Sequence, residues 1–275
     1  MNASLAAMLE RLDNPAHLHL GPAFTEALAR LHFAAEHHLG LAAVVGASGT
    51  GKTTLLRRFR RDLASSPACV VQLQLAGLGE AELRTTFAVQ LGIQSHSSWL
   101  RIADRLTELA YDETPLIVLA DDAERVQNES LQALGRLWDA DPTGQLRLSM
   151  VLAIDEVSLA TLPPAWLQRI DLRVELQPWS LEDTARFLAS VVGDERMRQR
   201  GFEPEAVERL HQISHGLPRL LRRYAHLSLL ASEGQQRLTV DAATVTGACH
   251  ELCQVGGMHD YNGPAIEFLE DEFLV

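Results

Sequence analysis

The sequence predicts an α/β fold, in which a five-stranded parallel sheet is sandwiched by helices and followed by a small all-helical domain. Two observations predict it. Short apolar runs rich in β-branched residues alternate with segments whose apolar residues recur with the helical period. After residue 177 the strand-like runs stop, and only helical segments follow. We therefore expect an α/β domain over residues 1–177, a helical lid over 178–252 and an acidic C-terminal tail over 253–275.

Five apolar runs predict the strands, since each is short and bounded by polar or turn-forming residues. In chain order they cover residues 41–45, 69–75, 116–120, 146–154 and 172–176. Apolar residues with helical spacing predict helices before the first strand and between the later ones. These helices cover residues 24–37, 51–63, 80–91, 98–111 and 129–139. Strands separated by helices in this way pair in parallel.

Start signals divide the lid into four helices. Ser180 is a suitable N-cap, and Asp183 at the third helical position completes a variant of the capping box. Two of the later helices begin with proline, which is favoured in the first turn. The predicted helices cover residues 180–192, 204–215, 218–232 and 239–252, the last of them starting at Thr239 or Asp241.

Composition excludes several classes of protein. With 275 residues, of which 47% are hydrophobic, the chain has enough apolar material for a full core, which excludes disordered, collagen-like and disulfide-scaffold proteins. The three cysteines are too few for a secreted disulfide framework. The N-terminus lacks a signal-peptide pattern, and no apolar run reaches the roughly 18–20 residues of a spanning helix. We therefore expect a soluble, cytoplasmic protein without a transmembrane segment.

The charge is acidic and unevenly distributed. The chain has 24 basic and 36 acidic residues, a formal net charge of -12, and Lys52 as its only lysine. Six of the acids fall between Glu251 and the C-terminus, where there is no basic residue. An acidic balance argues against a protein whose main task is to grip the phosphate backbone of nucleic acid. DNA binding is thus disfavoured without being excluded, since arginine clusters on two predicted helices could form a local basic face.

A complete phosphate-binding motif, G-x-x-x-x-G-K-[ST], lies between a predicted strand and a predicted helix. Its residues are Gly46, Ala47, Ser48, Gly49, Thr50, Gly51, Lys52, Thr53 and Thr54. In such a phosphate loop, backbone N–H groups and the positive end of the helix surround the phosphates. Lys52 would reach the β- and γ-phosphates, and the Thr53 hydroxyl would bind Mg²⁺. A glycine-rich turn that binds nothing is the alternative, and the full motif in its proper context argues against it.

The motif therefore predicts a nucleotide and Mg²⁺ as ligands. GTPases that are specific for guanine use a second lysine to recognise the base, and this chain has none. We expect ATP.

Two acids end the third predicted strand. In P-loop ATPases an aspartate at this position holds Mg²⁺ and the next acid polarises the attacking water, roles that would fall to Asp121 and Asp122. An acid pair that only caps a loop is the alternative. Because the second acid is usually glutamate and aspartate is one methylene shorter, we expect slow hydrolysis. Glu124, two residues further on, is expected to point elsewhere.

The phosphate loop, the acidic strand end and the helical lid, in this order, resemble the AAA+ ATPases. Among these the chain is most similar to the ExeA-type branch of general secretion pathway protein A and pilus-biogenesis ATPases, which is related to transposition ATPases. The resemblance covers about residues 15–250 and includes Leu167-Gln-Arg-Ile170 and Ser214-His-Gly-Leu-Pro-Arg219. It implies ATP hydrolysis at the subunit interfaces of a ring or helical homo-oligomer.

The resemblance also implies two arginines at the site. Arg169 would be an arginine finger inserted into the neighbouring subunit's ATP, and Arg219 the sensor-2 arginine of the lid. Each could instead be a surface arginine in an ion pair. For Arg219 there is an independent argument, because a cation in the first turn of a helix opposes the helix dipole and needs another reason for its place, such as a phosphate.

The chain departs from the family pattern at the end of the fourth strand. There Asp155 stands where the family has a small amide or hydroxyl residue, and an acid at this sensor-1 position would repel a γ-phosphate. Three hypotheses follow. The first is an ATPase that couples nucleotide state to assembly or remodelling of a protein partner, in secretion or pilus biogenesis. The second is an ATP-gated scaffold with little or no hydrolysis. The third is a DNA-associated ATPase of transposition or replication-initiation type.

The tail over 253–275 alternates apolar and acidic residues towards its end. It is either a disordered, solubilising end or a docking peptide for a protein partner with a basic, apolar groove.

Overall fold

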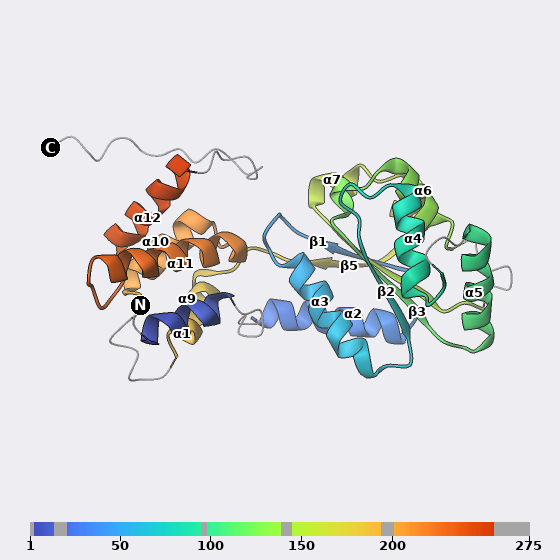
Figure 1. The fold of residues 1–275 in the computed structure, drawn as a ribbon, viewed down its shortest axis with the longest axis horizontal. Coiled ribbons are helices and arrows are strands. Elements are labelled where there is room, and N and C mark those ends of the chain that lie inside the picture. Colours follow the sequence, from blue (N-terminus) through green and yellow to red (C-terminus); the bar gives the residue numbers. More distant parts are fainter. Residues whose placement is uncertain (1–2, 14–20, 95–97, 139–144, 194–200, 256–275) are drawn as a thin grey trace.

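The computed structural model describes residues 3–13, 21–94, 98–138, 145–193 and 201–255 (Figure 1). Its sheet has five strands, all of them parallel, in the order β2-β3-β4-β1-β5. The strands are β1 (Leu41–Val45), β2 (Cys69–Gln74), β3 (Leu116–Asp121), β4 (Leu148–Ile154) and β5 (Ile170–Glu175). The predicted fold class is confirmed, and the acidic tail lies outside the described residues apart from the end of the last helix.

The central strands are buried on both faces because helices cover each side of the sheet. Every residue of β1, β3 and β4 is buried, as the continuous apolar runs predict. Successive residues point to opposite faces, so Ala43 and Val45 enter one core cluster while Ala42 and Val44 enter another. This alternation fixes which helices each strand residue contacts.

Two groups of helices form the outer layers. One face is covered by α2 (Pro22–Glu36) and α3 (Lys52–Asp62), which pack on each other and on the strands. The opposite face is covered by α4 (Glu80–Gln90), α5 (Trp99–Tyr111) and α6 (Asn128–Gly135). Short helices α7 (Glu156–Ala160) and α8 (Pro164–Leu167), which the sequence patterns did not predict, lie between β4 and β5.

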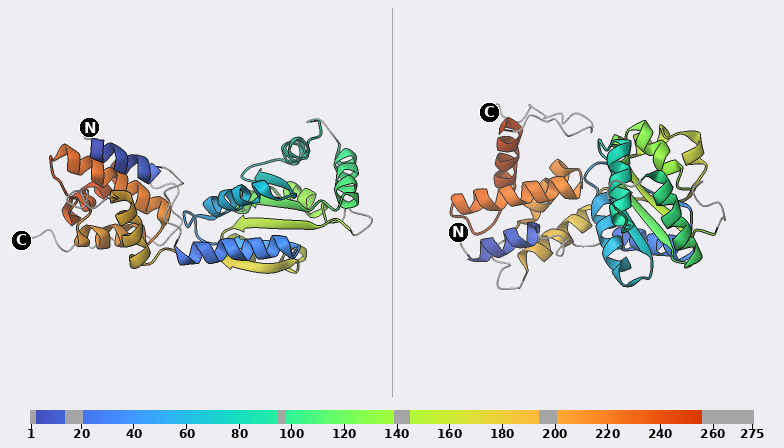
Figure 2. Two further views of the ribbon diagram at one scale, coloured as in Figure 1. Left: turned by 90° about the horizontal axis from the view of Figure 1, so that it is seen from below. Right: turned by 45° about the vertical axis from the view of Figure 1, so that its right-hand side comes forward.

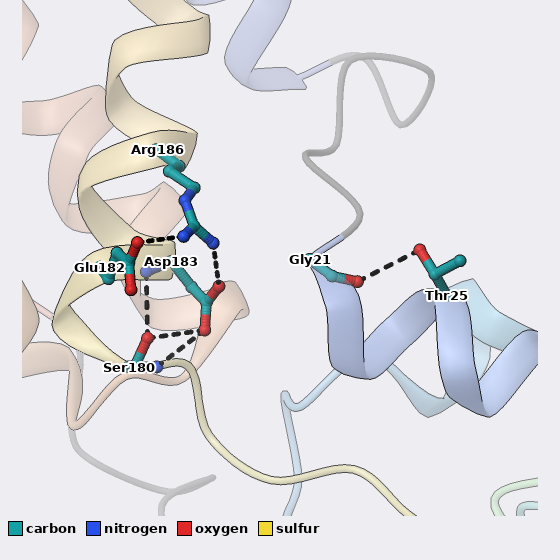
Figure 3. A network of polar contacts seen from close by, with 6 residues as sticks. All are labelled: Gly21, Thr25, Ser180, Glu182, Asp183 and Arg186. Carbon is teal, nitrogen blue, oxygen red and sulfur yellow. Dashed lines mark hydrogen bonds and ion pairs between the residues drawn. The ribbon is translucent and has the colours of Figure 1, made fainter.

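The lid lies to one side of the sheet and its covering helices (Figures 1 and 2). It contains α9 (Leu181–Val192), α10 (Pro204–Ser214), α11 (Pro218–Gly234) and α12 (Ala242–Val255). Ser180 caps α9, since its Oγ accepts a hydrogen bond from the Asp183 N–H at 3.1 Å while its own N–H donates to Asp183 Oδ2 at 3.3 Å (Figure 3). The predicted capping box is therefore present.

An N-terminal helix, α1 (Ala3–Asp13), packs on the lid although it comes first in the chain (Figure 1). Its buried residues Leu5, Met8, Leu9 and Leu12 share a core cluster with α9, α10, α11 and α12. Arg11 Nη1 adds hydrogen bonds to the carbonyls at the end of α9. This packing differs from the prediction of a single domain over residues 1–177, because the apolar stripe of α1 is covered by lid helices and not by the sheet.

No helix within the described part of the chain combines the length and apolarity that crossing a membrane requires.

Candidate functional site

The phosphate loop joins the end of β1 to the start of α3. Gly49 and Gly51 have φ values of 91° and 110°, which residues with a Cβ rarely adopt. The loop closes on itself through Thr50, whose Oγ1 donates to the Ala47 carbonyl at 2.9 Å. Gly46 lies so close to the following linker that a Cβ there would be 2.6 Å from the Leu176 carbonyl oxygen. The glycines at these positions are therefore required by the backbone path.

Lys52 is held inside this loop. Its side chain is only 6% exposed, and Nζ donates to the Gly46 carbonyl at 2.7 Å and to the Ala47 carbonyl at 3.5 Å. Both acceptors are neutral loop carbonyls, so this positive charge has no ion-pair partner within 4 Å among the described residues. A polyphosphate placed in the loop would supply one.

Asp121 ends β3 next to the phosphate loop and is fully buried. Its Oδ1 accepts from the Asp122 N–H at 3.0 Å, whereas Oδ2 has no hydrogen-bond partner among the described residues. Burial raises the pKa of this carboxyl and the charge of Asp122 adds to the effect, while the Thr53 hydroxyl and the Lys52 ammonium lower it. A buried carboxylate oxygen beside a threonine hydroxyl is a donor set that fits Mg²⁺, which takes one or two protein oxygens and completes its shell with phosphates and water.

Asp122 lies at the mouth of the site in a left-handed conformation, with φ 54° and ψ 45°. Aspartate tolerates this region better than most residues. Its Oδ2 accepts a hydrogen bond from Nε2 of Gln74, the last residue of β2. Asp122, the predicted water-polarising acid, is thus hydrogen-bonded to the end of the neighbouring strand β2.

Glu124 lies in the short 3-10 turn that follows (Ala123–Arg125) and lines the same cavity as Lys52 and Thr53. The expectation that it points elsewhere is wrong. Asp122 has a left-handed backbone conformation, and the turn that follows it places Glu124 at the cavity. Its Oε2 is buried without a hydrogen-bond partner among the described residues. Burial is the main reason why its pKa is raised.

Asp155 has a structural task that the sequence patterns did not indicate. It is the N-cap of α7, and its carboxylate accepts from the Ser158 N–H at 2.7 Å and the Ser158 hydroxyl at 3.1 Å. An acid at the end of β4 is therefore explained by helix capping.

The lid closes the other side of the site through α11. Arg219, in the first turn of α11, donates its backbone N–H to the Gly49 carbonyl at 3.3 Å and its Nη1 to Ser48 Oγ at 3.3 Å. Between α11 and the phosphate loop lies a cavity of about 630 Å³, within the usual range for small-molecule sites. The loop, the acids and the lid all contribute to its walls. Arg222, Arg223 and His226 of α11 also line it, and none of the three was predicted as a site residue.

Arg169 lies outside this cavity. It is exposed just after α8, and its guanidinium carbon is 5.0 Å from the centre of the Trp138 ring, an arrangement typical of a cation–π contact. The structure therefore brings together the predicted residues of the phosphate loop, Asp121, Asp122 and Arg219, and leaves Arg169 on the surface of the same chain.

Comparisons with known proteins agree with this geometry. Residues 35–163 match a family model described as AAA domain. The chain is 26% identical over 263 residues to general secretion pathway protein A of Aeromonas hydrophila, an alignment that covers 90% of this chain and 46% of the relative. The chain thus spans less than half the length of that relative. The predicted resemblance is confirmed.

Solved structures share the fold. Cdc6p from Pyrobaculum aerophilum superimposes with a TM-score of 0.70 at 17% identity, covering 88% of this chain and 70% of that one. The ORC2 protein of Aeropyrum pernix, solved in ADPNP and ADP complexes, gives a TM-score of 0.58 at 19% identity, covering 82% and 66%. At such identities the likeness shows the fold alone.

Proposed function

We propose that the chain, whose residues 35–163 match the AAA-domain model, binds Mg-ATP in the cavity between the phosphate loop and α11 and hydrolyses it. One observation carries this proposal. Lys52 and Thr53 line the cavity, the buried Asp121 lies behind them in hydrogen-bond contact with Thr53, and Arg219 of α11 lines the same cavity and contacts the phosphate loop. A ligand that satisfies all four groups has several phosphates and accompanies a divalent cation.

The residues of the phosphate loop act through charge and backbone geometry. Lys52 would exchange its two neutral carbonyl partners for phosphate oxygens, a gain because the new partners carry negative charge that attracts the ammonium. The start of α3 directs its free N–H groups to the same place. Thr53 and Asp121 would hold Mg²⁺, which supplies neutralisation of phosphate charge when bound.

Arg219 is the element that would report the nucleotide to the lid. It already contacts Ser48 and Gly49, so a bound γ-phosphate gives its guanidinium a charged partner within the same cavity. Arg219 belongs to α11, and α11 shares one hydrophobic core with α1 and the other lid helices. A movement of Arg219 towards a phosphate would therefore move α11 and, through this core, the whole lid.

We further propose a homo-oligomer in which Arg169 acts on the ATP of a neighbouring subunit, since it is exposed and cannot reach the cavity of its own chain. The cytoplasmic assignment rests on the few cysteines of the sequence. A role in assembling or remodelling a protein partner rests on the similarity to general secretion pathway protein A. Slow hydrolysis is expected only where Asp122 is the water-polarising acid, so the rate depends on which carboxylate takes that role.

ATP binding by the Lys52→Ala variant tests the proposal at its root. We expect the dissociation constant, measured by calorimetry with Mg²⁺, to rise about 10- to 100-fold, the equivalent of about 1.5–3 kcal/mol for hydrogen bonds to a charged group. Arg57→Ala, which removes an exposed cation from the same helix, is the matched control and should bind ATP as the wild type does. Equal affinities in both variants would exclude the phosphate loop as the binding site.

A further inference from the structure

We propose that Glu124, and not Asp122, is the carboxylate that orients and deprotonates the water attacking the γ-phosphate. This inference rests on the proposed ATPase function and names the residue that performs its central step. It departs from the expectation that the acid directly after Asp121 takes this role.

The carboxylate of Asp122 already accepts a hydrogen bond from another side chain. The amide of Gln74 donates to its carboxylate, and this bond ties the ends of the neighbouring strands β2 and β3 together. Its backbone is fixed in the left-handed region, which limits how far the side chain can be redirected. Asp122 also lines the cavity, but Gln74 holds one of its oxygens and its side chain is one methylene shorter than that of glutamate.

Glu124 has neither obstacle. It lines the same cavity as Lys52 and Thr53. One of its carboxylate oxygens, Oε2, is buried and has no donor among the described residues. A buried acceptor without a donor is costly, so the carboxylate gains when the side chain turns and this oxygen meets a water in the cavity. Such a water would lie next to the phosphate loop, because Glu124 lines the same cavity as Lys52 and Thr53.

The electrostatic surroundings suit a general base. Burial raises the pKa of Glu124, which makes the carboxylate a better proton acceptor. The groups that act on it are Lys52 of α3, which favours the charged form, and Asp122 and Asp155, which disfavour it. The triphosphate of a bound nucleotide adds negative charge in the same direction as the two acids, while the accompanying Mg²⁺ opposes it.

The chemical step is hydrolysis of the terminal anhydride. The oxygen of the water attacks the γ-phosphorus as its proton passes to Glu124. The bond between the γ-phosphorus and the bridging oxygen breaks, and its electron pair stays on that oxygen, which belongs to ADP. Inorganic phosphate leaves, and Glu124 returns its proton to solvent. Water is the only co-reactant.

Two isosteric amide variants test the assignment against the alternative. We measure phosphate release at saturating ATP, together with the dissociation constant for a non-hydrolysable ATP analogue. Glu124→Gln should lower turnover at least about 100-fold, the scale of lost general-base catalysis, with an analogue affinity within about threefold of the wild type. Asp122→Asn should lower turnover less than about tenfold, because asparagine can keep the contact with Gln74. The exposed acid Glu129 serves as control, and Glu129→Gln should match the wild type.

Each contrary result overturns the assignment. Turnover that survives in Glu124→Gln but is lost in Asp122→Asn returns the role to Asp122. A loss of analogue binding in Glu124→Gln makes Glu124 a binding group. A wild type that binds ATP and releases no phosphate removes the catalytic role while leaving the nucleotide site standing, whereas failure of the wild type to bind ATP contradicts the proposed function itself.

Discussion

At the level of single residues, the phosphate loop depends on a close approach between the backbone of Gly46 and the atoms around it. At Gly46 an added Cβ would lie 2.6 Å from the Leu176 carbonyl and 2.8 Å from Thr50 Oγ1. Since Leu176 follows the last strand and leads to the lid, this contact joins the phosphate loop to the linker. A side chain at position 46 would move one or the other.

Gly46→Ala is therefore expected to destabilise the fold by about 1–3 kcal/mol, the usual cost of overpacking, and to weaken ATP binding. Gly247→Ala is the matched control, because Gly247 is exposed within α12 and a Cβ there meets nothing within 4 Å. That change should stabilise α12 by about 0.5–1 kcal/mol. Urea unfolding of both variants measures the contrast, and equal stabilities would refute the close approach at Gly46.

The phosphate loop could be predicted completely from the sequence, whereas the position of Glu124 could not. The motif from Gly46 to Thr54 determines its own local geometry through glycine and the start of a helix. The direction of Glu124 depends on the left-handed conformation of Asp122, which no periodicity of apolar residues reports. Likewise, Gln74 becomes a partner of Asp122 only because β2 and β3 are neighbours in the sheet.

At the level of elements, capping residues set where the lid helices begin. Asp241 precedes α12, and its Oδ1 accepts from the Thr244 N–H at 2.7 Å. This bond and the Thr244 hydroxyl lower the pKa of the Asp241 carboxyl, with a smaller contribution from Arg237. The capping interaction therefore belongs to the ionised carboxylate.

Asp241→Ala should cost about 1 kcal/mol of unfolding free energy at neutral pH, as loss of an N-cap does. The folded-state pKa lies below the unfolded value, so the contribution of ionisation is complete above the unfolded pKa and is lost as pH falls through the folded one. Denaturant unfolding between neutral pH and about pH 3 measures this. Asp241→Ser keeps an uncharged cap, and its stability relative to Asp241→Ala should not change with pH. A constant difference between wild type and Asp241→Ala would contradict the account.

The packing of helix α1 on the lid could not be predicted from the spacing of apolar residues within single helices and strands. Leu5, Met8, Leu9 and Leu12 have the spacing of one helical face, a signal that could have revealed this helix, although it was not among the predicted elements. The spacing does not say what covers that face. Its partners are lid helices about 180 residues away, and such a long-range contact is decided by the packing of the whole chain. In contrast, the sheet helices and the start of α9 follow from local patterns.

At the level of the whole molecule, the nucleotide cavity is the place where the sheet and the lid meet. The phosphate loop lies at the carboxyl end of β1, where open parallel sheets bind their ligands. The lid contacts this loop through Arg219, and the backbone N–H of Trp179 in the linker donates to the Gly216 carbonyl at 2.8 Å. A nucleotide in the cavity is thus bound from both sides and would couple the two parts.

Hydrogen–deuterium exchange of the intact chain, with and without Mg-ATP, tests this coupling most directly. We predict that ATP protects the amides of the phosphate loop and those of the first turns of α11 together. In Arg219→Ala the loop should remain protected while α11 loses its protection; Arg186→Ala, which removes an exposed ion-paired arginine from α9, should behave as the wild type. Protection that is confined to the loop in the wild type, or that is absent from both segments, would contradict the account.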